Sequence, residues 1–165
     1  MIDEVLEARE KRYDTILDLI KKYKLPVICG KINYPGSNKN TPMSQKAYNI
    51  LENLIISKFK DHIIEQKNTR GADGNAFILV VNLNPIKAKK MAMDMEIEHE
   101  LGRIFDIDIY DLDGSSIGRE KMGVQGRKCV ICNSEARICI RERKHSLEDT
   151  INSIDKLINK YEIEI

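Results

Sequence analysis

The chain has 165 residues, of which 42% are hydrophobic and 32% charged, and its formal net charge is +1. This length suits one domain with a well-buried core, and the small net charge disfavours a surface that coats nucleic acid. The N-terminal sequence alternates acidic and basic residues without the apolar stretch of a signal peptide. No run approaches the roughly 18 apolar residues of a membrane span. We therefore expect a cytoplasmic protein with reduced cysteines and no membrane partner.

The N-terminal third of the chain predicts a helix, a strand and a second helix. Residues 5–24 carry apolar side chains at helical spacing with charges between them, as an amphipathic helix does. Residues 25–32 (LPVICGKI) follow as a short apolar strand, in which Cys29 is expected to be a core residue. A loop rich in Gly, Pro and Asn over residues 33–42 then leads into a helix predicted at residues 43–59.

The central part of the chain predicts two strands with a helix between them. Residues 76–83 (AFILVVNL) form a continuous apolar run, which is typical of a buried strand. Pro85 suits the first position of a helix that should run to about Glu100. Residues 104–110 alternate apolar and acidic side chains, as a strand with one polar face does, and DLDG at residues 111–114 predicts a hairpin turn.

The C-terminal part predicts one more helix. Ser146 and Asp149 have the spacing of a capping box, and apolar residues at helical spacing follow them. Because helices and strands interleave but a hairpin interrupts them, we expect an α+β fold, a single domain with a mixed sheet. Residues 1–126 should form its core, and residues 127–165 should form a knuckle and a C-terminal helix that pack on this core.

Three cysteines and one histidine lie within a short, irregular stretch. Their pattern is Cys129-x2-Cys132-x6-Cys139-x5-His145, and the first pair has the spacing of a zinc knuckle. Three thiolates and one imidazole form a closed tetrahedron that suits zinc and leaves no position for a catalytic water. The sequence therefore predicts a structural zinc site, with buried, reduced cysteines as the alternative.

Six basic residues surround these ligands, and three interpretations of them remain open. They can offset the charge of three thiolates, form a face that binds phosphates or an acidic partner, or be ordinary solvated surface. The six are Arg127, Lys128, Arg137, Arg141, Arg143 and Lys144.

A pair of carboxylates on the strand predicted at residues 104–110 is the best candidate for chemistry. Asp106 and Asp108 leave the same face of the strand with α-carbons roughly 6.5–7 Å apart, which suits magnesium bound beside a phosphate chain. Upstream, Gly102 would let backbone amides approach phosphate oxygens, and Arg103 would supply a bidentate phosphate contact. This Gly-x-x-x-Asp-x-Asp arrangement predicts a nucleotidyltransferase-like core, with a merely solvent-facing pair as the alternative.

Three further residues near the end of the third predicted helix are candidates for a third carboxylate or a general base. They are Glu96, Glu98 and His99, and a solvated helix terminus is the alternative interpretation.

Two segments together resemble one protein family. EIEHELGRIFDIDIYD, followed by GRKCVICNSEARICIRERKHSLED, is similar to the apo-citrate lyase phosphoribosyl-dephospho-CoA transferases, also called holo-[acyl-carrier-protein] synthases of citrate lyase. The family differs from this chain where Glu100 stands in place of a common proline and where Ile109 replaces valine. The matching positions are Glu96, His99, Leu101, Gly102, Arg103, Asp106, Asp108, Cys129, Cys132, Cys139, Arg141 and His145.

The resemblance implies a transferase that releases pyrophosphate. Its donor would be 2′-(5″-triphosphoribosyl)-3′-dephospho-CoA, and its acceptor a serine of the acyl-carrier subunit of citrate lyase. Asp106 and Asp108 would bind magnesium, Gly102 and Arg103 the triphosphate, and Glu98 or His99 would deprotonate the serine. Four further candidates for phosphate contacts, each with ordinary solvated surface as the favoured alternative, are Arg9, Arg12, Lys39 and Lys89.

Two other functions fit parts of the sequence. The cysteine cluster alone would suit a non-catalytic, zinc-stabilised binding module for an acidic protein or nucleic acid. The net charge and the lack of aromatic residues among the basic ones argue against nucleic acid. The six basic residues around the cysteine cluster, here called the basic rim, would instead dock an acidic carrier protein. A carrier-protein chaperone that has lost its chemistry is less compatible with the intact Asp106 and Asp108.

Overall fold

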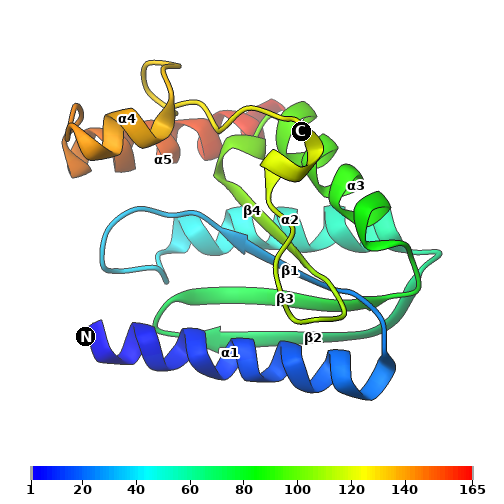
Figure 1. Cartoon of the computed structure of the whole chain (residues 1–165). Helices are drawn as coiled ribbons and strands as arrows, with labels where there is room; N and C mark the ends of the chain where they lie inside the picture. The colour runs from blue at the N-terminus through cyan, green and yellow to red at the C-terminus, as the bar shows by residue number, and fades with distance from the viewer. Residues whose placement is uncertain (1, 165) are drawn as a thin grey trace.

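The computed structural model describes the backbone of residues 2–164 and the side chains of residues 2–161. The described elements form one α+β domain (Figure 1). In chain order they are α1 (Ile2–Tyr23), β1 (Val27–Ile32), α2 (Pro42–Phe59), β2 (Ile63–Gly71), β3 (Gly74–Val81), α3 (Pro85–Glu98), the short 3₁₀ helix η1 (Gly102–Ile104), β4 (Phe105–Tyr110), a second 3₁₀ helix η2 (Arg119–Met122), α4 (Ala136–Arg141) and α5 (Leu147–Glu164).

The four described strands form a sheet in the order β2-β3-β1-β4, and every neighbouring pair is antiparallel. The prediction of a mixed sheet is therefore wrong. The reason is that β2 was not expected: without it, β1, α2 and β3 would form a parallel crossover unit. The additional strand reverses the chain direction once more, so that β3 runs antiparallel to β1.

The hydrophobic pattern of the sequence does not indicate strand β2, because it is a mostly polar edge strand. Only its first two residues are large and aliphatic, and its side chains are exposed or half-buried. Pairing with β3 makes it a strand, and the hairpin closes where Gly71 faces Gly74. Gly74 has φ +97°, a left-handed conformation that suits glycine in a tight turn. The Asp73-Gly74 pair was the one local signal of this hairpin.

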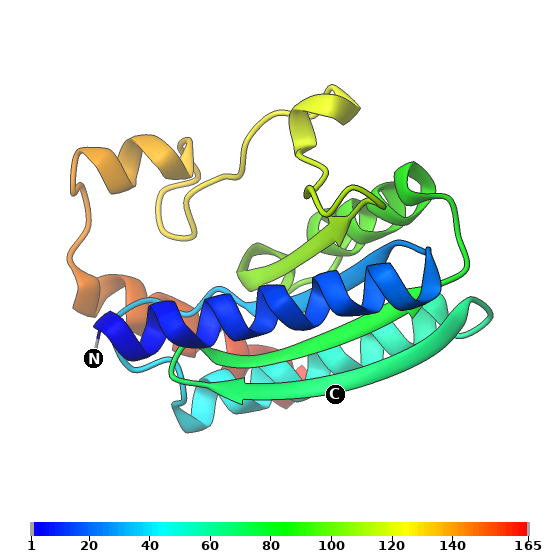
Figure 2. The same cartoon turned by 60° about the horizontal axis from the view of Figure 1, so that its bottom comes forward.

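Two layers of helices cover the two faces of the sheet. One face packs on α1 through a cluster that includes Ile16, Ile20 and Val80. The other face packs on α2, α3 and α5 through a larger cluster that includes Phe77 and Ile158. In the two views α1 lies across the sheet on one side, and α2 and α5 lie on the other (Figures 1 and 2). The C-terminal helix is thus part of the main core.

Local signals placed most of the remaining boundaries within two residues. The Asn84 side chain caps α3 by accepting hydrogen bonds from two backbone amides, and Ser146 accepts one from the Asp149 amide at the start of α5. The predicted turn at residues 111–114 is present, and Ser116 pairs with Tyr110 in a single antiparallel bridge. The short helix α4 was not predicted.

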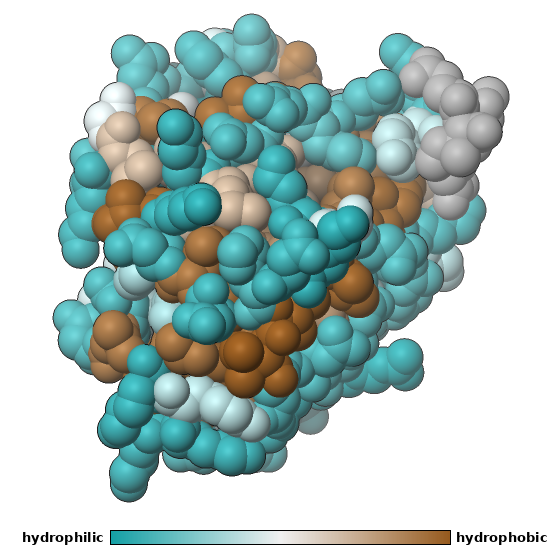
Figure 3. All heavy atoms as spheres, turned by 90° about the vertical axis from the view of Figure 1, so that its right-hand side faces the viewer, coloured by the Kyte–Doolittle hydropathy of each residue, from teal (hydrophilic) through white to brown (hydrophobic). Residues whose placement is uncertain are grey.

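The face on the right-hand side of Figure 1 shows apolar patches between hydrophilic side chains (Figure 3). Among the described residues, no helix combines the length and apolar character needed to cross a membrane.

Truncating Ile158 tests the place of α5 in the core. The side chain has no exposed surface and packs in the main cluster. Ile158→Ala should lower the free energy of unfolding by about 2–5 kcal/mol, because it leaves a cavity between α5 and the sheet. The exposed neighbour Asn159→Ala is the control. Chemical denaturation measures both, and equal stability of the two variants would show that α5 is not part of the core.

Candidate functional site

Asp106 and Asp108 lie on the edge strand β4, on the face of the sheet that carries α1. Strand β4 is an edge strand, and its apolar residues Phe105, Ile107 and Ile109 point into the main core. The two aspartates therefore point to the opposite face, the face of α1. Helix α1 packs on β1, β2 and β3 and passes beside β4 (Figure 2). The predicted pair is thus together on one face, with Asp106 exposed and Asp108 half-buried.

The two carboxylates repel each other in a partly desolvated place. Burial, and then the nearby charge of Asp106, raise the pKa of Asp108 to about 6, while Lys89 and Arg12 act in the opposite direction. A bound cation would relieve this repulsion. The backbone register places Asp106 opposite Lys31 of β1 and Asp108 opposite Cys29. As predicted, Cys29 is buried in the core, and burial raises the pKa of its thiol.

A first basic cluster adjoins the aspartates on the side of α1. Its centre is Asp73, which is buried in the β2–β3 turn and accepts hydrogen bonds from Arg12 and from Lys31, the latter at 2.6 Å. Arg9 and Lys39 lie near enough for their charges to act on each other, and burial, followed by this repulsion from Arg9, lowers the pKa of Lys39. The structure thus brings together three predicted phosphate contacts, with Lys31 as an additional cation.

A second basic cluster adjoins them on the side of α3. Its centre is Glu96, which is buried, lies 3.0 Å from a guanidinium nitrogen of Arg119 and 3.6 Å from one of Arg127. Lys89 is also buried on α3, and its charge acts on both Glu96 and Asp108. Glu96 is therefore an ion-pair partner of two arginines. Arg119, Arg127 and Lys89 together carry more positive charge than the single carboxylate of Glu96 offsets, so the net charge of the cluster is positive.

Both clusters contain residues that sequence reasoning missed. Lys31, Asp73 and Arg119 were not candidates, and Arg127 was assigned only to the rim of the cysteine cluster. Each becomes visible only through its partner on a distant segment: Arg12 and Asp73 are 61 residues apart, and Glu96 and Arg119 are 23 apart. The signal available in the sequence was weak, a lone charge within an apolar strand in the case of Lys31.

Gly102 has a packing role in the structure. It is buried, and a Cβ atom there would lie 2.1 Å from the carbonyl oxygen of Glu96. Its amide donates to the His99 carbonyl at 2.8 Å, and Arg127 donates to its carbonyl at 2.7 Å. The Gly102 amide is thus already paired, and the predicted approach of backbone amides to phosphate oxygens at this position stays a prediction. Glycine is required here because the last turn of α3 and the start of η1 meet backbone to backbone.

Glu98 and His99 lie on the other side of the sheet from the aspartates. The His99 ring stacks on Phe105, with ring centroids 5.1 Å apart, and Phe105 belongs to the main core. The Nδ1 atom of His99 accepts a hydrogen bond from the Leu101 amide at 3.0 Å, and its Nε2 lies 3.3 Å from the Tyr161 hydroxyl. Glu98 is exposed beside it. The structure does not bring either residue to Asp106, so their predicted role as base is not supported by this geometry.

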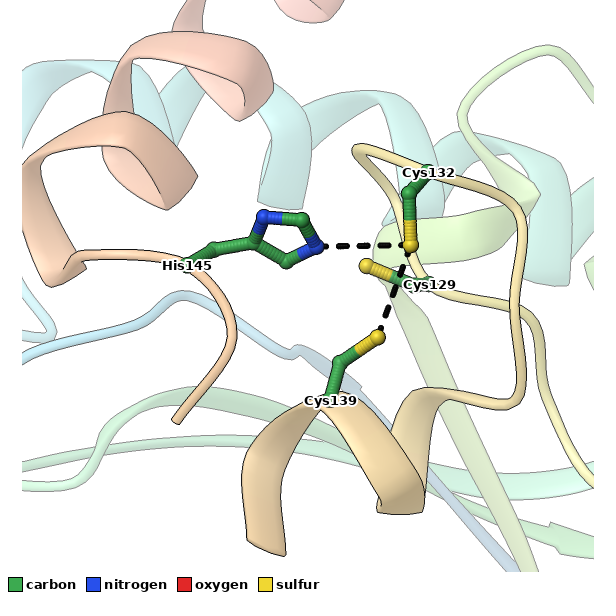
Figure 4. A group of neighbouring side chains, drawn as sticks. All are labelled: Cys129, Cys132, Cys139 and His145. Carbon is green, nitrogen blue, oxygen red and sulfur yellow. Dashed lines mark hydrogen bonds between the residues drawn. The ribbon is translucent and has the colours of Figure 1, made fainter. Parts of the chain in front are cut away.

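The four predicted zinc ligands converge. Cys129 and Cys132 come from the loop before α4, Cys139 from α4 and His145 from the segment before α5, and their side chains point to a common centre (Figure 4). All four ligand atoms lie within 4.8 Å of one another. The Cys132 Sγ is 3.5 Å from Cys139 Sγ and 3.3 Å from His145 Nε2. Tetrahedral zinc–thiolate bonds of about 2.3 Å separate sulfurs by about 3.8 Å, so this group can hold such a metal.

The surroundings favour the thiolate form at Cys132 and disfavour it at Cys139. Hydrogen bonds from Ser134, and then from His145, lower the pKa of Cys132 to about 5, and the Lys144 ammonium lies 3.7 Å from its sulfur. The Ile131 amide donates to Cys129 Sγ at 3.4 Å. By contrast, burial and the hydrogen bond with Cys132 raise the pKa of Cys139 to about 11. A metal cation is what would allow all three sulfurs to be ionised together.

Hydrogen bonds link the cysteine segment (residues 127–145) to the residues directly before β4. The Arg127 guanidinium donates to the carbonyls of Gly102 and Arg103, at 2.7 and 2.9 Å, directly before β4. Arg103, the middle residue of η1, is half-buried, and burial lowers its pKa. The arrangement as a whole offers two carboxylates between two groups of cations, which is suited to a polyphosphate with a divalent metal.

Comparison with known proteins identifies the family. The family described as apo-citrate lyase phosphoribosyl-dephospho-CoA transferase matches residues 1–161. A protein of Vibrio cholerae named "Probable apo-citrate lyase phosphoribosyl-dephospho-CoA transferase" is 28% identical over 97% of this chain and 92% of its own length. A Streptococcus pyogenes protein of the same name is 31% identical over 97% of this chain and 86% of its own.

A third relative is a longer protein. The "Protein CitXG" of Leuconostoc mesenteroides is 31% identical over 96% of this chain, which corresponds to 35% of its own length. The match thus extends over nearly the whole chain in each case and includes both the aspartate strand and the cysteine segment. The chain belongs to the apo-citrate lyase phosphoribosyl-dephospho-CoA transferase family.

Proposed function

We propose that this protein transfers the phosphoribosyl-dephospho-CoA group from 2′-(5″-triphosphoribosyl)-3′-dephospho-CoA to a serine of the acyl-carrier subunit of citrate lyase. The observation that carries the proposal is the pair Asp106 and Asp108, which share one face of the sheet between two basic clusters. A binding module without catalysis would not need such a pair. Membership of the family supports the same donor and acceptor.

The reaction is a nucleotidyltransferase-type substitution at phosphorus. The serine oxygen attacks the phosphorus nearest the ribose and forms a phosphodiester. The bond from this phosphorus to the bridging oxygen breaks, and pyrophosphate leaves with the electron pair. Such a reaction depends mainly on positioning and on neutralising charge. The proton of the serine passes to a base that we leave unassigned.

The chain supplies cations for the phosphates on both sides of the aspartates. Arg12 and Lys31 are held by Asp73, and Arg119 and Arg127 by Glu96, so their side chains are oriented before any substrate binds. Preoriented cations stabilise the charge of the leaving pyrophosphate without reorganising during the reaction.

The aspartates fit a magnesium ion. Two carboxylates are the usual protein contribution to magnesium bound with substrate phosphates, and the raised pKa of Asp108 marks a place where a cation is favourable. Bound there, magnesium would draw charge from the phosphoryl oxygens. Asp106 and Asp108 would hold it, and the described cations would contact the remaining oxygens.

Zinc at the cysteine cluster would have a structural role. With four protein ligands, the site has no open position for substrate. It would fix the loop before α4, and through Arg127 the junction of α3 and β4. The basic rim from Arg127 to Lys144 would then dock the carrier subunit, in a protein that acts in the cytoplasm.

Removing the carboxylate charges tests the assignment of the aspartates. Asp106→Asn and Asp108→Asn should each lower the rate of carrier modification by at least about 100-fold, because the metal loses a charged ligand. Mass spectrometry of a carrier subunit incubated with donor, magnesium and enzyme measures the transfer. The control is Asp61→Asn, an exposed carboxylate before the edge strand β2. Full activity of both variants would contradict the metal assignment, whereas a wild-type protein without activity would contradict the function.

Metal analysis tests the cysteine cluster. We expect about one zinc per chain in the purified protein, and loss of this zinc with lower thermal stability in Cys132→Ser. Cys29→Ala is the matched control, because its thiol lies in the core away from the cluster, and it should keep the zinc. Elemental analysis and thermal unfolding measure both effects. Zinc-free protein that is as stable as the zinc-loaded form would refute a structural role.

A further inference from the structure

A pocket of about 600 Å³ lies between the cysteine segment, the loop after β1 and the first turns of α5. This volume is within the range of about 300–1,000 Å³ that small-molecule sites occupy. Most of its wall is apolar, formed by Ile104, Val130, Ala136, Ile140, Leu147 and Ile154. The aspartates do not line it, so it is separate from the site of phosphoryl transfer.

Apolar side chains at the pocket are uncovered in the free protein. Ile140 is 77% exposed and Leu147 is 55% exposed, although both line the pocket. Large exposed aliphatic groups around a concavity are typical of a binding surface rather than of a solvated one. A ligand that covers them must itself have an apolar part.

Two arginines give the pocket a preference for negative charge. Arg103 and Arg143 both line it. The Nε atom of Arg103 is buried and has no hydrogen-bond partner among the described residues. A buried guanidinium nitrogen without a partner costs free energy, and the part of the Arg103 guanidinium that lines the pocket can offset this cost by donating to a phosphate oxygen. The ligand therefore needs an anionic group as well as an apolar one.

Arg103 also connects the pocket with the aspartates. It belongs to η1, which continues directly into β4, and Asp106 is the second residue of that strand. Its charge acts on the cluster of Arg119, Arg127 and Glu96 as well as on Cys129 in the pocket wall. A molecule that reaches from the pocket to Asp106 thus passes Arg103. Such a ligand is elongated and has a phosphate between its two ends.

We propose that this pocket binds the dephospho-CoA part of the donor, with its apolar portion against Ile140 and Leu147 and a phosphate at Arg103. This inference rests on the proposed function, which supplies a donor with a polyphosphate at one end and a coenzyme-A-like arm at the other. A carrier protein is the less suitable occupant, because protein partners bind through much larger and flatter areas than a pocket of this volume.

Filling the pocket tests the inference with a fragment of the donor. Thr150 lines the pocket from α5, so Thr150→Trp should block it, and Ile140→Ser removes part of the exposed apolar wall. The control Ser57→Trp places the same large side chain at an exposed position of α2 that lines a different pocket. Calorimetric titration with dephospho-CoA alone measures binding to zinc-loaded wild type and the three variants, and circular dichroism checks their folding.

We expect dephospho-CoA to bind the wild type and Ser57→Trp equally, and its dissociation constant to rise at least about tenfold in Thr150→Trp and severalfold in Ile140→Ser. In the transfer assay the KM for the donor should rise in both pocket variants, and in Thr150→Trp the KM for the carrier should stay unchanged, because Thr150 lies on α5 outside the basic rim. Should Thr150→Trp fail to fold, Ile140→Ser decides, because its side chain is exposed.

Three results would overturn the proposal. One is equal binding of dephospho-CoA to all four proteins, another is no binding to the wild type, and the third is a rise in the KM for the carrier alone, which would make the pocket a protein-docking site. Each leaves the proposed function intact as long as the wild type modifies the carrier. A wild type that binds dephospho-CoA without transferring any group would refute the proposed function instead.

Discussion

The antiparallel pairing of β4 with β1 is the constraint on which the site depends. Alternation along β4 points Phe105, Ile107 and Ile109 into the main core and leaves the two aspartates on the opposite face. A shift of register by one residue would bury both carboxylates and expose three large apolar side chains, so burial of the core fixes the position of the pair. Because β4 is an edge strand beside α1, the pair remains accessible.

The two basic clusters beside Asp106 and Asp108 are built in the same way. Each basic cluster is built on one buried carboxylate, Asp73 in the β2–β3 turn and Glu96 on α3. These ion pairs are desolvated, and their net contribution to stability is therefore small or unfavourable. These ion pairs instead orient the cationic side chains. Arg12 and Lys31 lie on one side of the two aspartates, and Arg119 and Arg127 lie on the other. This arrangement is suited to an anion with several phosphates.

The cysteine segment and the sheet form one functional unit through few contacts. Arg127 hydrogen-bonds the backbone that enters β4, and the pocket lies where this segment, the loop after β1 and α5 meet. Zinc bound by the four ligands would thus shape the pocket wall as well as hold the segment. In the proposed reaction such a metal would lie next to the substrate, because Cys129 and Cys139 line the pocket and also belong to the group that could hold the metal.

The sequence by itself determined the elements with strong local signals and the groups whose chemistry depends on short spacing. The caps at Asn84 and Ser146, the apolar run of β3, the i, i+2 aspartates and the four ligands converging on one centre all follow from neighbours in the chain. Only the tertiary structure decided the rest. Strand β2 exists through its partner, and it makes the sheet antiparallel. Asp73 and Glu96 became centres of basic clusters, and His99 lies across the sheet from Asp106, because contacts between distant segments have no local pattern.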